Sequence, residues 1–341
     1  MRALLIGGSG FIGPFVCSEL QRAGHDVVVL HRGQTRVPPG VGDIIGDRRH
    51  LIDSSTALRA LAPDVVIDLV LSSGVQAREM LALFRGVARR VVALSSCDVY
   101  RACGVLHGSE RGPLEPLPLT ESSALRATRQ TYPPEQIKML QQVFGWLDDE
   151  YDKIPVEREI LGDRELPGTV LRLPMVYGPG DPLHRFLPML KRMEDRRPAI
   201  LLEEKQAAWR GPRGYVANVG AAIALAATSD RAQGRIYNVG ETESLSELEW
   251  ARLIAAAAEW KGEFAVRSAD LMPAHLRRPG NLDQHWVTDT TRIREELGYR
   301  EPVARADAVR RTIEWERANP APADPRAFDY AAEDAAISVR T

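Results

Sequence analysis

Short runs of mostly β-branched apolar residues recur along this chain and are separated by stretches with helical periodicity. Runs of this kind at residues 3–6, 26–30, 65–70 and 91–95 predict strands. Their apolar residues are consecutive rather than alternating, which is typical of strands covered on both faces. Strands that alternate with helices predict a doubly wound parallel sheet, and therefore an α/β fold of the Rossmann type.

Beyond this region the pattern is less regular. Residues 101–131 are rich in Pro, Gly and Ser and predict a long loop, of a length that is usually functional or mobile. Helical periodicity returns over residues 135–166, and residues 169–176 predict a further strand. Later helices are expected at 183–195, 215–229 and 247–260, with a strand at 235–239.

The order of these elements predicts three parts. Residues 1–175 form a dinucleotide-binding Rossmann domain, to which residues 215–240 return. Residues 176–214 and 241–317 form a smaller C-terminal α/β part that binds the substrate. Residues 318–341 are rich in Ala, Pro and charge, and predict a tail that is weakly ordered or lies as an arm on the surface.

Composition narrows the class of protein. The 44 basic and 46 acidic residues give a net charge of −2, without the basic excess of a nucleic-acid-binding protein, so no nucleic acid partner is expected. The 3 cysteines lack disulfide or metal-ligand spacing, so we expect no metal and a reducing cytoplasmic location. The N-terminus lacks a secretory leader, and no apolar run reaches the ~18 residues of a membrane span.

A glycine motif follows the first predicted strand and opens the first helix. In G-x-x-G-x-x-G the first glycine permits a tight turn, the second lets a pyrophosphate approach the backbone, and the third lets the helix pack on the strand. The helix N-terminus then offers N–H groups to phosphates. The motif predicts a nicotinamide dinucleotide site. The expected contacts are Gly7, Ser9, Gly10, Phe11, Ile12 and Gly13.

The end of the second strand bears on the choice between NAD and NADP. An NAD site usually has a carboxylate there, but this strand ends in His31 and Arg32. Arg32 favours NADP, since a guanidinium can bind a 2′-phosphate, although a solvated surface arginine is the alternative. Asp47 is a candidate for the adenine amino group or an ordinary turn residue. Leu69 is a further expected cofactor contact.

Several motifs, by their order and spacing, resemble the extended short-chain dehydrogenases/reductases of the NAD-dependent epimerase/dehydratase family. The resemblance runs from about residue 1 to residue 317. It implies a Rossmann domain, a smaller part that closes over a substrate (often a nucleotide-sugar), and a homodimer. The motifs are GGSGFIG (7–13), IGDR (45–48), LSSCDVY (94–100), LRLPMVYGPGD (171–181), RGYVANVGAAIALA (213–226), YNVGE (237–241) and TDTTRIREELGY (288–299).

The family's catalytic residues are a Ser or Thr, a Tyr, and a Lys four residues after the Tyr. By resemblance these are Ser96, Tyr151 and a lysine that is displaced, because Pro155 stands at the expected position and the lysine is Lys153. Residues two apart do not share a helix face. Lys153 can therefore serve only if the helix begins near Pro155, a residue that favours the first helical turn.

Two classes of function remain open at this point. One is an NAD(P)-dependent enzyme that transfers a hydride at a carbinol or carbonyl carbon of a sugar, nucleotide-sugar or related small molecule. The other is a catalytically degenerate cofactor-binding protein, regulatory or RNA-binding. GGSGFIG with HRGQT also resembles plant chloroplast stem-loop RNA-binding proteins. Epimerisation, dehydration and reduction are not separated by the sequence.

The resemblance also implies a set of residues around the substrate and the nicotinamide. Pro174 and Val176 are expected near the nicotinamide amide. Cys97 and Asp98 follow the catalytic serine, and a single acid there argues weakly against a dehydratase. Arg210 or Arg213, in two alternative registers, is expected to clamp a substrate pyrophosphate, and His184 to line the same region; exposed loop residues are the alternative.

Overall fold

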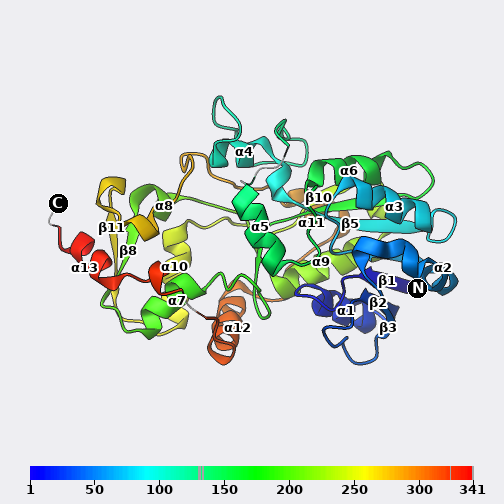
Figure 1. Ribbon diagram of the computed structural model, residues 1–341, viewed down its shortest axis with the longest axis horizontal. Helices are drawn as coiled ribbons and strands as arrows, with labels where there is room; N and C mark the ends of the chain where they lie inside the picture. Colours follow the sequence, from blue (N-terminus) through cyan, green and yellow to red (C-terminus); the bar gives the residue numbers. More distant parts are fainter. Residues whose placement is uncertain (130–131, 133, 323, 340–341) are drawn as a thin grey trace.

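The computed structural model describes residues 1–129, 132, 134–322 and 324–339. Its N-terminal and C-terminal parts lie at opposite ends of the long axis, with the N-terminus in one and the C-terminus in the other (Figure 1). Within the described residues, no helix combines the length and the apolar character needed to cross a membrane.

A parallel seven-stranded sheet forms the N-terminal part and confirms the predicted doubly wound α/β fold. The strand order is β10-β6-β5-β4-β1-β2-β3, so the direction of winding reverses beside β1. In such sheets ligands bind outside the carboxyl ends of the strands at this reversal. The strands are β1 (Arg2–Ile6), β2 (Asp26–His31), β3 (Gly42–Ile45), β4 (Val65–Asp68), β5 (Arg90–Ser96), β6 (Gly168–Leu173) and β10 (Ile236–Asn238).

Helices cover both faces of this sheet, which explains why the strand sequences do not alternate. Ala3 and Leu5 pack in one core cluster, whereas Leu4 and Ile6 pack in another across the sheet. Neighbouring helices α1 (Gly13–Arg22) and α9 (Val216–Thr228) cover the first face. The second face carries α2 (Ser55–Leu61), α3 (Gly74–Phe84) and α6 (Lys153–Gly162).

The C-terminal part contains two small parallel sheets and several helices. Strands β7 (Met175–Tyr177) and β9 (Arg213–Tyr215) form one sheet, and β8 (Ala199–Glu203) and β11 (Glu263–Arg267) form the other. The remaining α-helices of the described residues are α4 (Arg101–His107), α5 (Pro134–Val143), α7 (Leu187–Glu194), α8 (Glu204–Ala208), α10 (Glu247–Ala257), α11 (Thr291–Leu297), α12 (Arg305–Ala318) and α13 (Tyr330–Ser338).

Three predicted elements differ from the structure. The single strand expected at 169–176 is two strands in different sheets, because Pro174 lies between them and has no N–H for a ladder. The helical stretch expected at 135–166 is divided into α5 and α6. The expected loop at 101–131 begins with helix α4; its residues 130–131 lie outside the described residues.

The predicted C-terminal tail contains a packed helix. In α13, Glu333 and Ala336 are buried. Arg192 of α7 donates to both oxygens of Glu333, at 3.0 and 2.5 Å, and so fastens the helix to the C-terminal part. Residues 323, 340 and 341 of the predicted tail lie outside the described residues.

Candidate active site

In the glycine loop after β1, the fold requires glycine at two of the three motif positions but not at the third. Gly7 has φ +82°, and a Cβ on it would lie 2.6 Å from Val70 Cγ1. A Cβ on Gly13 would lie 2.1 Å from the Gly8 carbonyl oxygen. At Gly10 a Cβ would meet only the Gly7 oxygen, at 3.5 Å. The protein itself therefore leaves room above Gly10, where the motif predicts a pyrophosphate.

The start of α1 suits an anionic ligand. Ile12 is its N-cap residue and provides no capping side chain, so N–H groups and the positive end of the helix dipole face outward. Ser9 accepts a hydrogen bond from the Thr35 hydroxyl at 2.7 Å. Phe11 lies beside Gly180: its Cδ2 is 3.4 Å from the position that a Cβ on Gly180 would take. These residues fit a dinucleotide at the reversal point beside β1.

The residues at the end of β2 lie in unequal surroundings. His31 is buried, and its Nε2 lies 3.2 Å from Asp43 Oδ2. Both oxygens of Asp47 bind the Arg49 side chain, which lowers the pKa of the Asp47 carboxyl. Arg32 is exposed, and its Nη1 lies 3.4 Å from the carbonyl oxygen of Gly145, in the segment after α5. Among His31, Arg32 and Asp47, the positively charged side chain that is exposed to solvent is therefore Arg32.

The end of β4 is fixed by a buried ion pair that sequence reasoning missed. Arg48, from the IGDR motif, donates its Nε to Asp68 Oδ2 at 2.7 Å, and both side chains are almost fully buried. The Leu69 N–H donates to the Ile6 oxygen at 3.0 Å and Leu69 is buried. Arg48 and Asp68 thus hold the strand end next to the glycine loop.

Ser96 ends β5 at the carboxyl edge of the sheet. Its Oγ accepts a hydrogen bond of 3.2 Å from the Asp98 N–H and caps the short 3₁₀ turn Cys97–Val99. This leaves the hydroxyl proton of Ser96 to donate to a ligand. Cys97 is buried, contacts the Arg172 oxygen through its Sγ at 3.6 Å, and has its pKa raised by burial.

Helix α6 begins at Lys153, two residues before Pro155. Asp152 caps it by accepting the Ile154 N–H at 3.0 Å, so Tyr151 lies outside the helix. Lys153 is buried, and its Nζ donates to the carbonyl oxygens of Leu71 and, at 3.1 Å, Leu94. Leu94 lies near the carboxyl end of β5 and Leu71 lies three residues after β4, so the lysine lies at the carboxyl edge of the sheet, where the cofactor is predicted.

Position 155 faces away from this group. A Cβ on Gly74 of α3 would lie 2.8 Å from Pro155 Cβ, so the proline packs between α6 and α3. A lysine there would not extend toward the carboxyl edge of the sheet. The unusual spacing is explained by the break before α6, which frees Tyr151 from helical geometry.

Tyr151 contacts Asp98 directly. Its hydroxyl donates to Asp98 Oδ2 at 3.0 Å, and Lys153 Nζ lies 5.6 Å from the centre of its ring. Arg126, which sequence reasoning missed, donates to the Asp98 carbonyl oxygen at 2.6 Å and to Asp152 Oδ1 at 2.9 Å. The structure therefore brings Ser96, Asp98, Tyr151 and Lys153 together.

A second buried ion pair joins the elements that hold Ser96, Asp98, Tyr151 and Lys153 in place. Arg172 of β6 donates to both oxygens of Glu157 of α6, at 2.9 and 2.7 Å. Ser95 donates to Glu157 Oε1 at 2.5 Å. Glu157 lies one turn after Lys153 on the same helix face. The pair thus fixes α6 against β5 and β6.

Two of the predicted substrate residues are held by the C-terminal part. Arg213 forms an ion pair with Glu247 and lies 5.0 Å from the Trp250 ring centre. His184 Nδ1 lies 2.7 Å from Glu316 Oε2 of α12.

The other predicted substrate-side residues are not placed with the catalytic group by any contact. Arg210 is exposed, and its backbone N–H donates to His285 Nδ1 at 3.2 Å. Pro174 and Val176 are buried between β6 and the end of β7. Their roles toward the nicotinamide and the substrate stay predictions.

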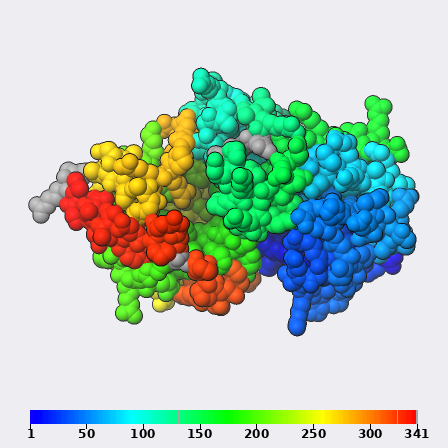
Figure 2. Space-filling model, viewed as in Figure 1, coloured from blue at the N-terminus to red at the C-terminus, as the bar shows by residue number. Residues whose placement is uncertain are grey.

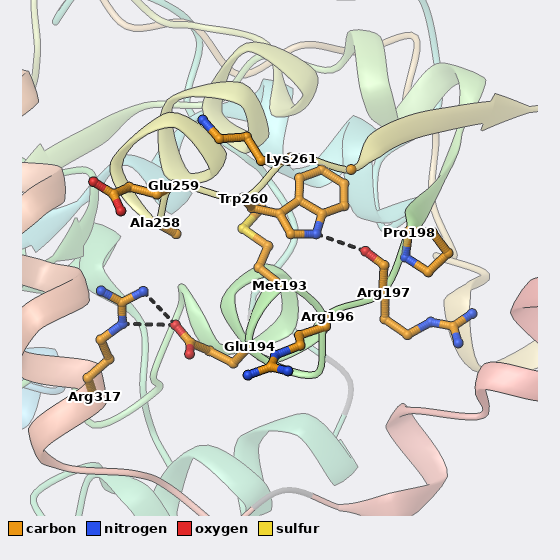
Figure 3. Close-up of a pocket in the computed structure, with 11 residues that line it drawn as sticks. Met193, Glu194, Arg196, Arg197, Pro198, Ala258, Glu259, Trp260, Lys261 and Arg317 are labelled. Atoms are coloured by element: carbon orange, nitrogen blue, oxygen red, sulfur yellow. Dashed lines mark hydrogen bonds and ion pairs between the residues drawn. The ribbon is translucent and has the colours of Figure 1, made fainter.

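A separate pocket of about 480 Å³ lies in the C-terminal part, beside α7 and the end of α10. Trp260 lies in its wall and donates to the Arg197 oxygen at 2.8 Å, and Arg317 binds Glu194 at 2.8 Å (Figure 3). None of the predicted cofactor or catalytic residues lines it. Among the described residues, His, Cys, Asp and Glu form no group of three that could hold a metal.

The chain matches a family model and is similar to several known proteins. The family model described as "NAD dependent epimerase/dehydratase family" matches residues 3–240. A 2′-dehydrokanamycin reductase of Streptomyces kanamyceticus is 28% identical over 288 residues, which cover 77% of this chain and 71% of the relative.

Solved structures show the same fold. The NAD complex of a Thermus thermophilus UDP-glucose 4-epimerase has a TM-score of 0.62 at 22% identity, covering 94% of this chain and 100% of that one. An epimerase of Methanothermobacter thermautotrophicus has a TM-score of 0.66 at 18% identity, covering 93% of this chain and 92% of that one. With the matched family model, these findings establish that the chain belongs to the NAD-dependent epimerase/dehydratase family of extended short-chain dehydrogenases/reductases, enzymes that use a nicotinamide dinucleotide.

Proposed function

We propose that this protein is an NADPH-dependent reductase of a ketone carried by a sugar or a sugar-like small molecule. The observation that carries the proposal is the gathering of Ser96, Tyr151 and Lys153 at the carboxyl edge of the sheet. A relative named as a reductase matches 77% of this chain and supports reduction, whereas two relatives named as dTDP-glucose 4,6-dehydratases match 29% and 24% of it.

Each residue has a distinct part in this reaction. The nicotinamide, when bound, supplies or accepts a hydride at the carbon. Tyr151 gives its phenolic proton to the carbonyl oxygen, and Ser96 donates a hydrogen bond to that oxygen. Lys153 supplies a nearby positive charge, which a phenol with an ordinary pKa near ~10 needs in order to exchange protons at neutral pH.

The alternative of a catalytically degenerate protein rested on a missing lysine. Lys153 lies at the carboxyl edge of the sheet, and position 155 faces α3. The absence of a lysine at position 155 therefore does not argue against catalysis. The family's dehydratase, epimerase and reductase members are enzymes, and we treat this chain as one.

The preference for NADP is supported by Arg32. It is exposed directly after β2, and none of residues 31–33, at the end of this strand, is a carboxylate. The first experiment is a fluorescence titration of the purified protein with NADPH and with NADH, after denaturation of a sample to release any retained nucleotide.

We expect NADPH to bind more tightly by about 10–100-fold, the value of a charge-assisted hydrogen bond. Arg32→Ala abolishes this preference and leaves NADH binding unchanged. Arg22→Ala, at the far end of α1, is the matched control. Tightly retained NAD would point instead to an internal redox cycle such as epimerisation. Turnover is then measured as loss of NADPH fluorescence with a panel of keto-sugars.

Two further proposals concern the assembly and the location. We propose a homodimer, as the family resemblance implies, through the face where α3 and α6 lie side by side; a monomer by light scattering at micromolar concentration would contradict it. We propose the cytoplasm as the location, since the three cysteines are unpaired and buried.

A further inference from the structure

The hydroxyl of Tyr151 has an unusual partner for a residue with its proposed role. It donates to Asp98 Oδ2 at 3.0 Å, while the Lys153 ammonium donates to two main-chain carbonyls. The proton of Tyr151 therefore points at a carboxylate.

Asp98 is placed to exchange that proton. It is 1% exposed, and its Oδ1 is buried without a hydrogen-bond partner among the described residues. The closest cation contact of Oδ1 is Arg126 Nη2, at 3.9 Å. A buried carboxylate that lacks partners on one oxygen is costly to keep charged, so it readily takes up a proton.

Arg126 fixes the position of Asp98 relative to Tyr151. Its Nε holds the Asp98 carbonyl oxygen at 2.6 Å and its Nη2 holds Asp152 Oδ1 at 2.9 Å. Asp152 in turn caps α6, directly after Tyr151. One arginine thus connects the turn that carries Asp98 to the segment that carries Tyr151.

We propose that Asp98 is a catalytic proton partner of Tyr151, so that two protons move together; this rests on the proposed reductase function. In the direction of reduction Asp98 starts protonated, and a bound reduced nicotinamide would supply the hydride that the carbonyl carbon gains. The carbonyl oxygen takes the proton of Tyr151, and Tyr151 Oη takes a proton from Asp98, which becomes a carboxylate. In the reverse direction Tyr151 takes the substrate proton and returns its own to Asp98 Oδ2.

The electrostatics agree with this role. Burial raises the pKa of Asp98, against the lowering effects of Arg126, the Tyr151 hydrogen bond and Lys153. Burial and the neighbouring Asp98 raise the pKa of Tyr151, so the phenol does not ionise alone and needs an acceptor for its proton. The titratable or charged groups that face Asp98 are Arg126, Tyr151, Asp152 and Lys153, together with Cys97, Cys103 and Tyr132.

The first test measures the ionisation of Tyr151 directly, in the protein without cofactor. Tyrosinate absorbance is titrated in the wild type and in Asp98→Asn, and the titration of the same protein carrying Tyr151→Phe is subtracted from each. We expect Asp98→Asn to shift Tyr151 ionisation to lower pH by about one unit, a tenfold change in its ionisation constant. Glu159→Gln is the matched control: it neutralises a carboxylate of the same helix that pairs with the exposed Arg78 and not with Asp98 or Arg126, and it should leave the titration in place.

The second test needs no variant. The kcat of the wild type is measured in mixtures of H₂O and D₂O. Two protons in flight give a curved dependence on the deuterium fraction; a straight line would overturn the relay, as would an unshifted Tyr151 titration. A shifted titration without turnover of any keto-sugar would overturn the proposed reductase function and the relay with it. Turnover with an unshifted titration would overturn the relay alone.

Discussion

Lys153 is an ammonium group at the carboxyl edge of the sheet with very little water around it. Burial lowers its pKa to about 8, against the raising effect of the acids that face it. Those acids are Asp98, Asp68, Asp148 and Glu157. A small change of pH near neutrality therefore changes the charge beside Tyr151, which an ordinary lysine would keep constant.

The first prediction concerns stability against pH. The unfolded chain holds the Lys153 proton up to its usual pKa of about 10.4, whereas the folded protein releases it near pH 8. Between these values the unfolded state holds the Lys153 proton and the folded state does not, so the contribution of Lys153 to folded stability rises with pH, by an amount on the order of 3 kcal/mol. The three buried cysteines, whose pKa values burial raises, lower stability over the same range in both proteins. Urea unfolding across this range should therefore show wild-type stability rising relative to that of Lys153→Met. Parallel curves for the two proteins would contradict it.

The second prediction separates two glycines of the same loop. Gly10→Ala should leave the melting temperature unchanged, because its Cβ has room, but should weaken NADPH binding by about tenfold or more. Gly13→Ala should instead destabilise the protein by about 2–4 kcal/mol, because its Cβ would clash with the Gly8 carbonyl oxygen. Calorimetry and fluorescence titration check both. Equal melting temperatures for the two variants would contradict the assignment.

At this scale the sequence predicts some residues and not others. The glycine loop is local, so its spacing is visible along the chain. The family resemblance predicts Ser96, Tyr151 and Lys153 as catalytic residues and Asp98 as a substrate-side residue, but it does not predict the contact of Tyr151 with Asp98. This contact depends on Arg126, which lies far from both in sequence and has no motif of its own.

Among the elements, α6 does the most to position the site. It carries Lys153 toward the sheet edge and Pro155 against α3, and Glu157 binds Arg172 of β6. The sequence predicts a helix here, but not the break before it. The break is fixed by Asp148, whose oxygens accept hydrogen bonds from the hydroxyls of Ser72 and Ser73 at 3.0 and 2.8 Å. Periodicity cannot reveal contacts between distant segments.

The third prediction compares two ion pairs made by α6. Arg172→Met should destabilise the protein by about 3–5 kcal/mol, since it leaves the buried Glu157 charge uncompensated. Arg78→Met breaks the exposed pair with Glu159 and should cost less than about 1 kcal/mol. Adding Glu157→Leu to Arg172→Met should restore much of the loss. Denaturant unfolding gives all three values, and equal losses for the two single variants would contradict the prediction.

Over the whole molecule, the two parts are built from interleaved stretches of chain. The segment after residue 134 lies at the centre of one face, between the blue N-terminal part and the red C-terminal end (Figure 2). Helix α13 lies at the far end, and His275 and Arg192 both bind its Glu333. The carboxyl edge of the sheet, where the cofactor is predicted, and helix α13 are therefore held in place by different contacts.

The fourth prediction follows from that separation. Removal of residues 329–341 exposes the buried surface under α13 and leaves Arg192 without Glu333, so the melting temperature should fall by several degrees. NADPH affinity should change by less than about twofold, because no predicted cofactor contact lies in this segment. A thermal melt and a fluorescence titration of the truncated protein check this. A large loss of NADPH binding would contradict the independence of the two regions.

The return of β10 to the sheet has a consequence for how the chain folds. β6 ends at Leu173, but its partner β10 begins only at Ile236, after much of the C-terminal part. As the chain leaves the ribosome, the edge of β6 stays unpaired until this late strand arrives. Unpaired edges of this kind join other chains, and such long-range pairings form slowly. A fragment of residues 1–175 should therefore aggregate rather than fold as an independent dinucleotide-binding domain.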